Sequence, residues 1–247
     1  MTIEIDAPNS PKPPADPGPG TSVWPKYSEP PSVAFFDVDG TLLPKTTSYL
    51  FVRLLLEKRL IRPTILLQSL YRGMQHHFGR LDYARLVDYA ARKIGHLSID
   101  VLESNAQETF DREVQPRLYQ GAVDHAAELR EMGTPVVLIS SSPRLVLEPL
   151  ARHLGCADVL STPFVIENGR FAGIGDGPPC YGPGKVHWAK TWCDAHRHPL
   201  ERAAAYADNW SDRLLLECVG QANVVHPRRK LRRLARERGW NVIRPRS

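Results

Sequence analysis

Short apolar runs that end in polar or turn residues recur along this chain, and they predict a set of buried β-strands. These runs cover residues 33–36, 135–140, 159–160, 204–207, 223–225 and 242–243. Amphipathic stretches at residues 122–132 and 143–154 stand between them and have the period of helices. Alternating strands and helices are typical of a parallel sheet covered by helices, so we predict an α/β fold.

Residues 45–120 interrupt this alternation and show a helical pattern throughout. Three glycines, Gly73, Gly79 and Gly95, punctuate the pattern, and Pro63 stands near a predicted helix start. We interpret this region as a helical insert. Its apolar segments, at residues 49–61 and 65–71, are expected to form the core of a helix bundle.

The first 31 residues differ from the rest in composition. They contain nine prolines and few large apolar side chains. Such a segment buries too little surface to offset the entropy lost on ordering. We therefore predict a disordered leader over residues 1–31 and an α/β core made of residues 32–44 and 121–247.

Within this core, Asn168-Gly169 is a turn signal between apolar runs and predicts a hairpin.

Composition narrows the class of protein. The chain has 247 residues, 42% of them hydrophobic, which is enough for a full core and a smaller second domain. Its longest apolar stretch, residues 49–56, is interrupted by Arg53 and is far shorter than the roughly 18 to 20 residues of a membrane span. The four cysteines are widely spaced, which favours reduced thiols over disulfides or a zinc site. We expect a cytoplasmic location.

Positive charge is concentrated at the C-terminal end. Residues 226–247 hold nine lysines and arginines and one glutamate, a net charge of +8, so the preceding residues carry −3 of the total of +5. Leu231, Leu234 and Ala235 fall on one face of a predicted helix that ends at Gly239. The favoured interpretation is a solvated terminal helix, and the alternative is peripheral contact with an anionic membrane. Nucleic acid is not expected, because no aromatic residues interleave with the charges.

The most informative segment is VAFFDVDGTLL at residues 33–43. It places Asp37 and Asp39 two residues apart where an apolar strand ends, and Gly40 permits a sharp turn. Two carboxylates in this arrangement can divide the work of phosphoryl transfer, Asp37 as nucleophile and Asp39 as proton donor and acceptor. Taken alone, the segment also fits a strand followed by an ordinary Asp-Gly turn.

Ser140 ends the apolar run at residues 135–140 and precedes a predicted helix. A hydroxyl beside a helix N-terminus can bind a phosphoryl oxygen. A serine-rich turn also caps helices, and we predict that role for Ser142, with Pro143 at the first helical position.

Lys185 stands in a Gly-Pro-Gly-Lys segment that we predict to be a loop before an amphipathic stretch at residues 187–196. Its ammonium group can neutralise a phosphate and the nucleophile Asp37. The alternative is a solvated surface lysine.

Asp208 and Asp212 follow the apolar run at residues 204–207. Carboxylate oxygens are the ligands that Mg²⁺ prefers, so these two residues together with Asp37 predict a magnesium site. Considered alone, Asp212 also fits a helix N-cap and Asp208 a loop residue.

Aspartates, serine, lysine and aspartates at successive strand ends resemble the four motifs of the haloacid dehalogenase superfamily, in the chain order of that family. The resemblance covers about residues 33–243. The insert at residues 45–120 is similar to the cap domain of the phosphoserine-phosphatase-like subgroup, subfamily IB. The resemblance therefore implies a Rossmann-like parallel sheet with a helical cap inserted between the first and second motifs.

The resemblance also implies a role for each matching residue. Asp37 is the nucleophile, Asp39 the general acid and then base, and Lys185 stabilises charge. Thr41 and Ser140 bind the substrate phosphate together with Lys185. The implied magnesium ligands are Asp37, the backbone carbonyl of Asp39, Asp208 and Asp212. An acid at position 39 favours phosphate esters as substrates, because the dehalogenases of the superfamily lack it.

Two departures from the subgroup bear on the substrate. Thr46 stands where phosphoserine phosphatases usually have a glutamate, and Ser140-Ser141-Ser142 stands where they have Ser-Gly-Gly. Phosphoserine is therefore not the favoured substrate. We expect a Mg²⁺-dependent phosphatase that hydrolyses a small phosphorylated metabolite through an aspartyl-phosphate. The alternatives are a membrane-associated lipid-phosphate phosphatase, a phosphoserine phosphatase and a non-catalytic phosphate-binding protein of the same fold.

Overall fold

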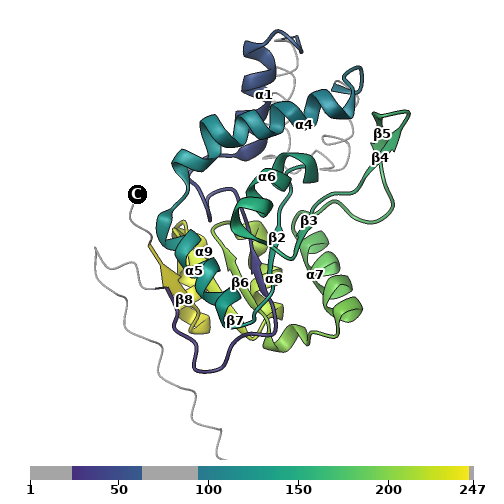
Figure 1. Cartoon of the computed structure of the whole chain (residues 1–247). Coiled ribbons are helices and arrows are strands. Elements are labelled where there is room, and N and C mark those ends of the chain that lie inside the picture. Colours follow the sequence, from purple (N-terminus) through teal and green to yellow (C-terminus); the bar gives the residue numbers. More distant parts are fainter. Residues whose placement is uncertain (1–23, 63–93, 245–247) are drawn as a thin grey trace, which may run out of the picture.

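A parallel sheet forms the centre of the computed structural model, which describes residues 24–62 and 94–244 (Figure 1). Its six strands lie in the order β3-β2-β1-β6-β7-β8. They are β1 Ala34–Phe36, β2 Val136–Ile139, β3 Asp158–Leu160, β6 Ala204–Ala207, β7 Gln221–Val225 and β8 Asn241–Ile243. Each strand agrees with a predicted range to within a residue or two, so the predicted α/β fold is confirmed.

The direction in which strands are added to the sheet reverses at β1. This strand pairs in parallel with β2 on one side and with β6 on the other. The chain proceeds from β2 to β3 toward one edge, and from β6 through β7 to β8 toward the other. Such a reversal opens a crevice at the carboxyl ends of the two central strands, where ligands bind in open α/β sheets.

Helices cover both faces of this sheet. Consecutive strand residues point to opposite faces, so Phe36 stacks on Tyr206 while Phe35 meets the edge of Trp192 on the other side. Burial on both faces explains why the strands read as continuous apolar runs. The helices on the Phe36 face are α5 Gln120–Glu131 and α6 Arg144–Leu154, and those on the Phe35 face are α7 Pro183–His196, α8 Arg213–Cys218 and α9 Arg229–Arg238.

The segment that precedes β1 packs against the core. The Trp24 ring stacks on His125 at 5.0 Å between centroids, and the hydroxyls of Tyr27 and Tyr206 are 2.6 Å apart. The prediction of a disordered leader is therefore wrong for residues 24–31. Proline content dominated that prediction, whereas the two aromatic side chains bury enough surface to hold the segment in place.

Two helices of the predicted insert are described, α1 Thr47–Glu57 and α4 Ile99–Thr109. Their apolar faces meet through Phe51, Leu55 and Leu102, which are all buried. The chain then continues through a π-helical turn, Phe110–Val114, and a 3₁₀ turn, Gln115–Arg117. The predictions for residues 1–23 and 63–93, which include the apolar segment at 65–71, lie outside the described residues.

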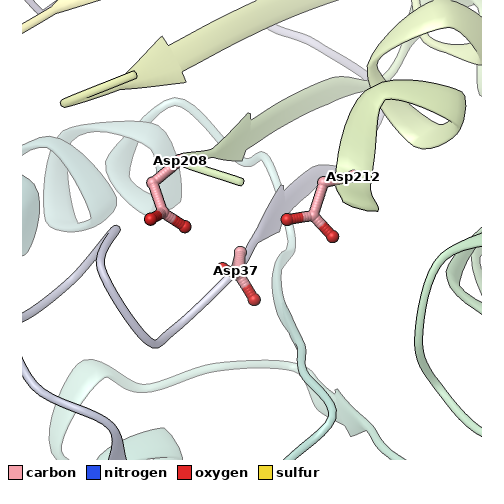
Figure 2. A group of neighbouring side chains, drawn as sticks. All are labelled: Asp37, Asp208 and Asp212. Atoms are coloured by element: carbon pink, nitrogen blue, oxygen red, sulfur yellow. The ribbon is translucent and has the colours of Figure 1, made fainter. Parts of the chain in front are cut away.

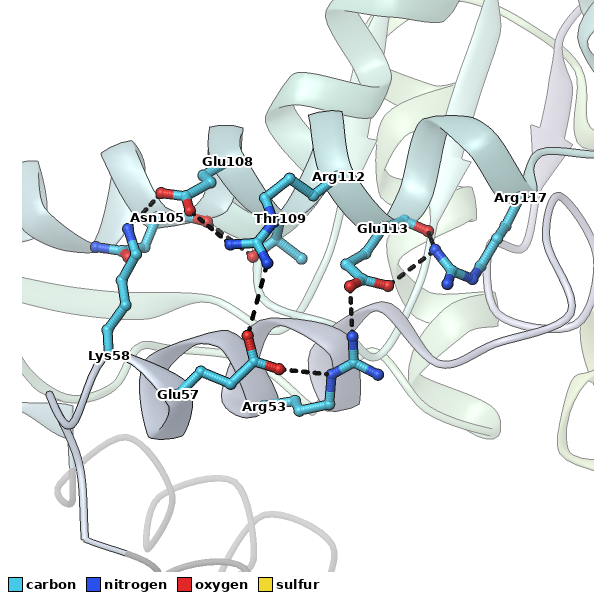
Figure 3. Close-up of polar contacts among 9 residues, drawn as sticks. All are labelled: Arg53, Glu57, Lys58, Asn105, Glu108, Thr109, Arg112, Glu113 and Arg117. Carbon is cyan, nitrogen blue, oxygen red and sulfur yellow. Dashed lines mark hydrogen bonds and ion pairs between the residues drawn. The ribbon is translucent and has the colours of Figure 1, made fainter.

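Ion pairs join the polar faces of α1 and α4 and extend into the two turns (Figure 3). Arg53 pairs with Glu57 at 3.3 Å and with Glu113, which also accepts from Arg117 at 2.8 Å. Similar contacts link Arg112 with Glu57 and Glu108, and Lys58 with Glu108. The described part of the insert is thus held together by an apolar face and a charged one.

An antiparallel hairpin, β4 Phe164–Glu167 and β5 Arg170–Ile174, confirms the predicted Asn168-Gly169 turn. Both turn residues have positive φ, 50° and 70°. The Ile99 amide donates to the Gly169 carbonyl at 2.8 Å, so the hairpin contacts the start of α4. No helix among the described residues combines the length and apolar character needed to cross a bilayer.

Candidate active site

Asp37 and Asp39 lie at the carboxyl end of β1. The Asp37 amide still donates to the Tyr206 carbonyl at 2.9 Å, so the sheet fixes this residue, and its side chain is buried. Gly40 then turns the chain with φ of 89°. A Cβ at this glycine would lie 2.3 Å from Asp208 Oδ2. Glycine is therefore required both by the backbone conformation and by the close approach of the second acidic segment.

Lys185 lies between two of these carboxylates. Its Nζ is 2.7 Å from Asp37 Oδ1 and 2.7 Å from Asp212 Oδ1, and the side chain is buried. The prediction that Lys185 belongs to a loop is wrong, because α7 begins at Pro183 and the lysine is in its first turn. Proline is favoured at the first helical position, where its missing N–H costs no hydrogen bond.

Three carboxylates from two strand ends converge in Figure 2. One oxygen of each of Asp37, Asp208 and Asp212 lies within 4.8 Å of the others. The Asp212 side chain does not cap α8, and Asp208 Oδ1 is buried with no hydrogen-bond partner among the described residues. Three acidic groups outnumber the single charge of Lys185, and their hard oxygen atoms fit a divalent cation such as Mg²⁺.

Burial and mutual repulsion weaken the acidity of this cluster. Burial, followed by the charge of Asp37, raises the pKa of Asp208 to about 8. Burial also raises the pKa of Asp212 to about 6, although Lys185 opposes the change. Burial disfavours the charged form of Lys185, but the two carboxylates outweigh it and raise the pKa of the ammonium group above its usual value. Lys185 therefore stays charged, and a further cation would favour the ionised carboxylates.

Ser140 and Thr41, the predicted phosphate ligands, are both buried. Ser140 Oγ accepts a hydrogen bond from the Ser142 amide at 3.2 Å, which leaves its own proton for an external acceptor. The Thr41 hydroxyl has no partner among the residues that the structure describes. Both hydroxyls are thus available as donors, and their role as phosphate ligands stays a prediction.

Three residues with hydroxyl groups lie around Asp39, a contact that the sequence did not predict for any of them. The Thr47 amide and hydroxyl each lie 2.8 Å from Asp39 Oδ1, and Ser142 Oγ lies 3.2 Å from Asp39 Oδ2. Ser48 bonds in turn to Ser142. The prediction that Ser142 caps the following helix is wrong, because its hydroxyl faces Asp39 and α6 has no side-chain cap. The Ser142 contacts join residues 94 and 103 positions apart, and no local spacing signals them, whereas Thr47 follows Asp39 by eight residues at the start of α1.

Comparison with known proteins places this site in a family. The model of the haloacid dehalogenase-like hydrolases matches residues 34–217, from β1 to α8. A probable phosphatase of Mycobacterium tuberculosis is 29% identical over 98% of this chain and 83% of its own length. A phosphoserine phosphatase of the same organism, SerB1, is 30% identical over 85% of this chain and 70% of its own length.

A solved structure has the same architecture. The crystal structure of a protein of unknown function from Bordetella pertussis superposes with a TM-score of 0.79 and 26% sequence identity. The match covers 85% of this chain and 97% of that chain. The likeness therefore extends well beyond the sheet that carries the acidic residues.

Proposed function

The chain belongs to the haloacid dehalogenase-like hydrolase family, and on that premise we propose that it is a Mg²⁺-dependent phosphatase that phosphorylates its own Asp37 during turnover. The substrate is a phosphomonoester of a small metabolite. One observation carries this proposal: Lys185 Nζ lies 2.7 Å from Asp37 Oδ1 in a buried cluster with two more carboxylates. The phosphatase names of the two relatives support the same reaction class.

In the first half-reaction, a carboxylate oxygen of Asp37 attacks phosphorus and the bond from phosphorus to the ester oxygen breaks. Asp39 donates a proton to the departing oxygen. Lys185, Ser140 and Thr41 hold the phosphoryl oxygens, where charge is concentrated during the transfer. The product alcohol leaves, and Asp37 carries the phosphoryl group.

In the second half-reaction, Asp39 is a carboxylate and takes a proton from water. The water oxygen attacks phosphorus, the bond from phosphorus to Asp37 breaks, and inorganic phosphate leaves. Asp39 suits both roles, because burial raises its pKa while hydrogen bonds from Thr47 and Ser142 oppose the change. Its carboxyl therefore gains and loses a proton closer to neutral pH than a free aspartate does.

Asp37, Asp208 and the backbone carbonyl of Asp39 are the proposed protein ligands of Mg²⁺, and Asp212 binds it directly or through water. When bound, Mg²⁺ offsets the repulsion between the anionic substrate and the acidic cluster. The buried and unpartnered Asp208 Oδ1 supports this assignment.

We further propose that residues 45–120 act as a cap that closes over the core of residues 32–44 and 121–247, excludes water and contacts the substrate. The four cysteines, all unpaired in the structure, favour a cytoplasmic site of action.

Phosphoserine is the second candidate substrate, favoured by the similarity to the phosphoserine phosphatase SerB1, which is 30% identical. The residue at position 46 argues against it. Thr46 is exposed at the start of α1 and offers a hydroxyl where phosphoserine phosphatases usually present a carboxylate to the substrate amine. We therefore propose a substrate without a free amino group beside the phosphate.

Phosphate release tests the proposed function directly. The panel contains phosphoserine, sugar phosphates, nucleotides and lysophosphatidate, each with and without Mg²⁺. We expect Mg²⁺-dependent release that falls by a factor on the order of 10⁴ in Asp37→Asn, because the amide is a poor nucleophile. Asp124→Asn, an exposed change on α5, is the control and should keep full activity. Equal release by wild type and Asp37→Asn would refute the proposal, and preference for lysophosphatidate would favour the lipid-phosphate alternative.

A further inference from the structure

Ser142 connects three parts of the candidate active site. It follows β2, its side chain is only 2% exposed, and its Oγ lies 3.2 Å from Asp39 Oδ2. On its other side, Ser142 Oγ is 2.9 Å from Thr47 Oγ1 and 2.7 Å from Ser48 Oγ. Thr47 is the first residue of helix α1. The Ser142 hydroxyl, which follows β2, therefore contacts both the proposed proton donor Asp39 and the start of the insert.

One assignment of the hydroxyl protons gives both oxygens of Asp39 a hydroxyl donor. A hydroxyl has one proton, and an ionised carboxylate only accepts. The Thr47 hydroxyl is within hydrogen-bonding distance of both Asp39 Oδ1, at 2.8 Å, and Ser142 Oγ, at 2.9 Å, and we assign its proton to the carboxylate because a charged acceptor binds more strongly. Ser142 gives its proton to Asp39 Oδ2. Ser48 then donates to Ser142. In this arrangement each of the three protons has one acceptor, and the chain of donors ends on Asp39.

The two oxygens of Asp39 are therefore not equivalent. Oδ1 accepts from both the amide and the hydroxyl of Thr47, which fills its two lone pairs. Oδ2 accepts only from Ser142 among the described residues, which leaves one lone pair for a transferred proton. The oxygen that exchanges protons with the substrate is thus Oδ2, the one that Ser142 holds.

We propose that Ser142 is a positioning residue for proton transfer: its hydrogen bond to Asp39 Oδ2 aims the remaining lone pair of that oxygen at the leaving group. This inference rests on the proposed function. It assigns Ser142 a role that the glycine usual in phosphoserine phosphatases at this position has no side chain to perform.

The inference makes a distinctive kinetic prediction. Proton donation matters most when the departing oxygen is strongly basic, as in an alkyl phosphate, and least for a nitrophenolate, which leaves without a proton. Ser142→Ala should therefore lower kcat/KM roughly tenfold to a hundredfold for alkyl phosphates and less than about threefold for p-nitrophenyl phosphate. kcat/KM is the relevant quantity, because it reports the steps up to the first irreversible one, the phosphorylation of Asp37.

The experiment measures kcat/KM with Mg²⁺ for a series of phosphomonoesters whose leaving groups range from alkyl to nitrophenyl. The slope of log kcat/KM against leaving-group pKa should be steeper in Ser142→Ala than in wild type. Thr134→Val is a matched control, because Thr134 is equally buried and donates its hydroxyl to the Pro31 carbonyl at 2.9 Å, but it precedes the amino end of β2, whereas Ser142 follows the carboxyl end. Its slope should equal that of wild type.

A loss of the same size for all substrates in Ser142→Ala would overturn the inference, because that pattern indicates a general structural defect. If Ser142→Ala does not fold, Ser48→Ala serves instead, because it removes the hydrogen bond that Ser48 donates to Ser142. Ser48→Ala should steepen the slope less than Ser142→Ala, and an unchanged slope in Ser48→Ala would also overturn the inference. A folded wild type that hydrolyses no member of the series would instead refute the proposed function itself.

Discussion

Lys185 is the residue on which the charge balance of the site depends most directly. It is buried between Asp37 and Asp212, and each contact is 2.7 Å long. Removing one partner of a buried ion pair leaves the other charge without compensation, which costs more than a surface pair contributes. The lysine therefore has a structural role as well as its proposed part in binding phosphate.

Lys185→Met should lower the free energy of unfolding by roughly 3 kcal/mol in the absence of Mg²⁺. The loss should be larger at about pH 8 than at about pH 6. The folded pKa values of Asp208 and Asp212, about 8 and about 6, lie above the ordinary carboxyl value, so the folded state binds more protons and loses stability as pH rises through this window. Without the lysine, these carboxylates resist ionisation further.

Urea unfolding at both pH values measures this effect. The control is Lys190→Met, because Lys190 lies on the same helix but is exposed, and it should change stability little. Equal stability of Lys185→Met and wild type at the higher pH would contradict the assigned role.

At this scale, the residues of the candidate site that could be predicted are those that stand at the end of an apolar run. Asp37, Ser140 and Asp208 each follow an apolar run, and parallel strands bring their carboxyl ends to one edge. The hydroxyls of Thr47 and Ser142 could not be found in this way. Thr47 contacts Asp39 because the turn after β1 brings the start of α1 back to it, and Ser142 does so because the end of β2 lies beside β1; no apolar pattern marks either hydroxyl.

At the scale of elements, the strands were predictable and one helix start was not. Burial on both faces gives each strand an uninterrupted apolar run. The start of α7 was missed because Gly182, Pro183 and Gly184 are typical of loops. In the structure Gly182 has φ of 54° and ends the loop, and Pro183 begins the helix.

The segment before β1 is the second part of the chain for which local composition led to a wrong prediction. Its packing against the core can be tested directly. Trp24→Ala removes the ring that stacks on His125 and lies 5.9 Å from Tyr206. We expect the free energy of unfolding to fall by about 2 kcal/mol, less than for a fully buried tryptophan because Trp24 is partly exposed. Tyr49→Ala, at a side chain that is 50% exposed on α1, is the aromatic control. If chemical denaturation gave both variants the free energy of unfolding of the wild type, the result would favour a disordered leader that includes Trp24.

The ion pairs between α1 and α4 were not predictable, since they join residues far apart in sequence. Most of their side chains are substantially exposed, so each pair contributes little to stability. Their location is more informative than their strength. They connect α1, whose first residue bonds to Asp39, with the turns that lead back to the core (Figure 3).

At the scale of the whole molecule, the chain leaves the core for the insert and returns to it at two points. Both points lie close to the acidic cluster. The Tyr119 amide donates to the Leu42 carbonyl at 2.9 Å, which ties the returning chain to the outgoing one. Thr47 then joins the start of α1 to Asp39. Any movement of α1 relative to the sheet therefore acts on the proposed proton donor.

The basic C-terminal helix gains a clearer description from the structure. Leu231 and Ala235 of α9 are buried against the sheet, Leu234 is half-buried, and Gly239 ends the helix with φ of 68°. The apolar face of α9 is thus occupied by the core and is not available for insertion into lipid. Contact with an anionic membrane stays a prediction, and it would have to be electrostatic and sensitive to salt.

The central claim, a phosphoryl group carried by Asp37, can be tested by trapping. Borohydride reduces an aspartyl-phosphate to homoserine, which peptide mass spectrometry locates. During turnover with Mg²⁺ and the best substrate of the panel, we expect homoserine at position 37 in wild type and none in Asp37→Asn. Homoserine at Asp39 or Asp208, or none at any aspartate of an enzyme that is turning over, would contradict the proposed mechanism.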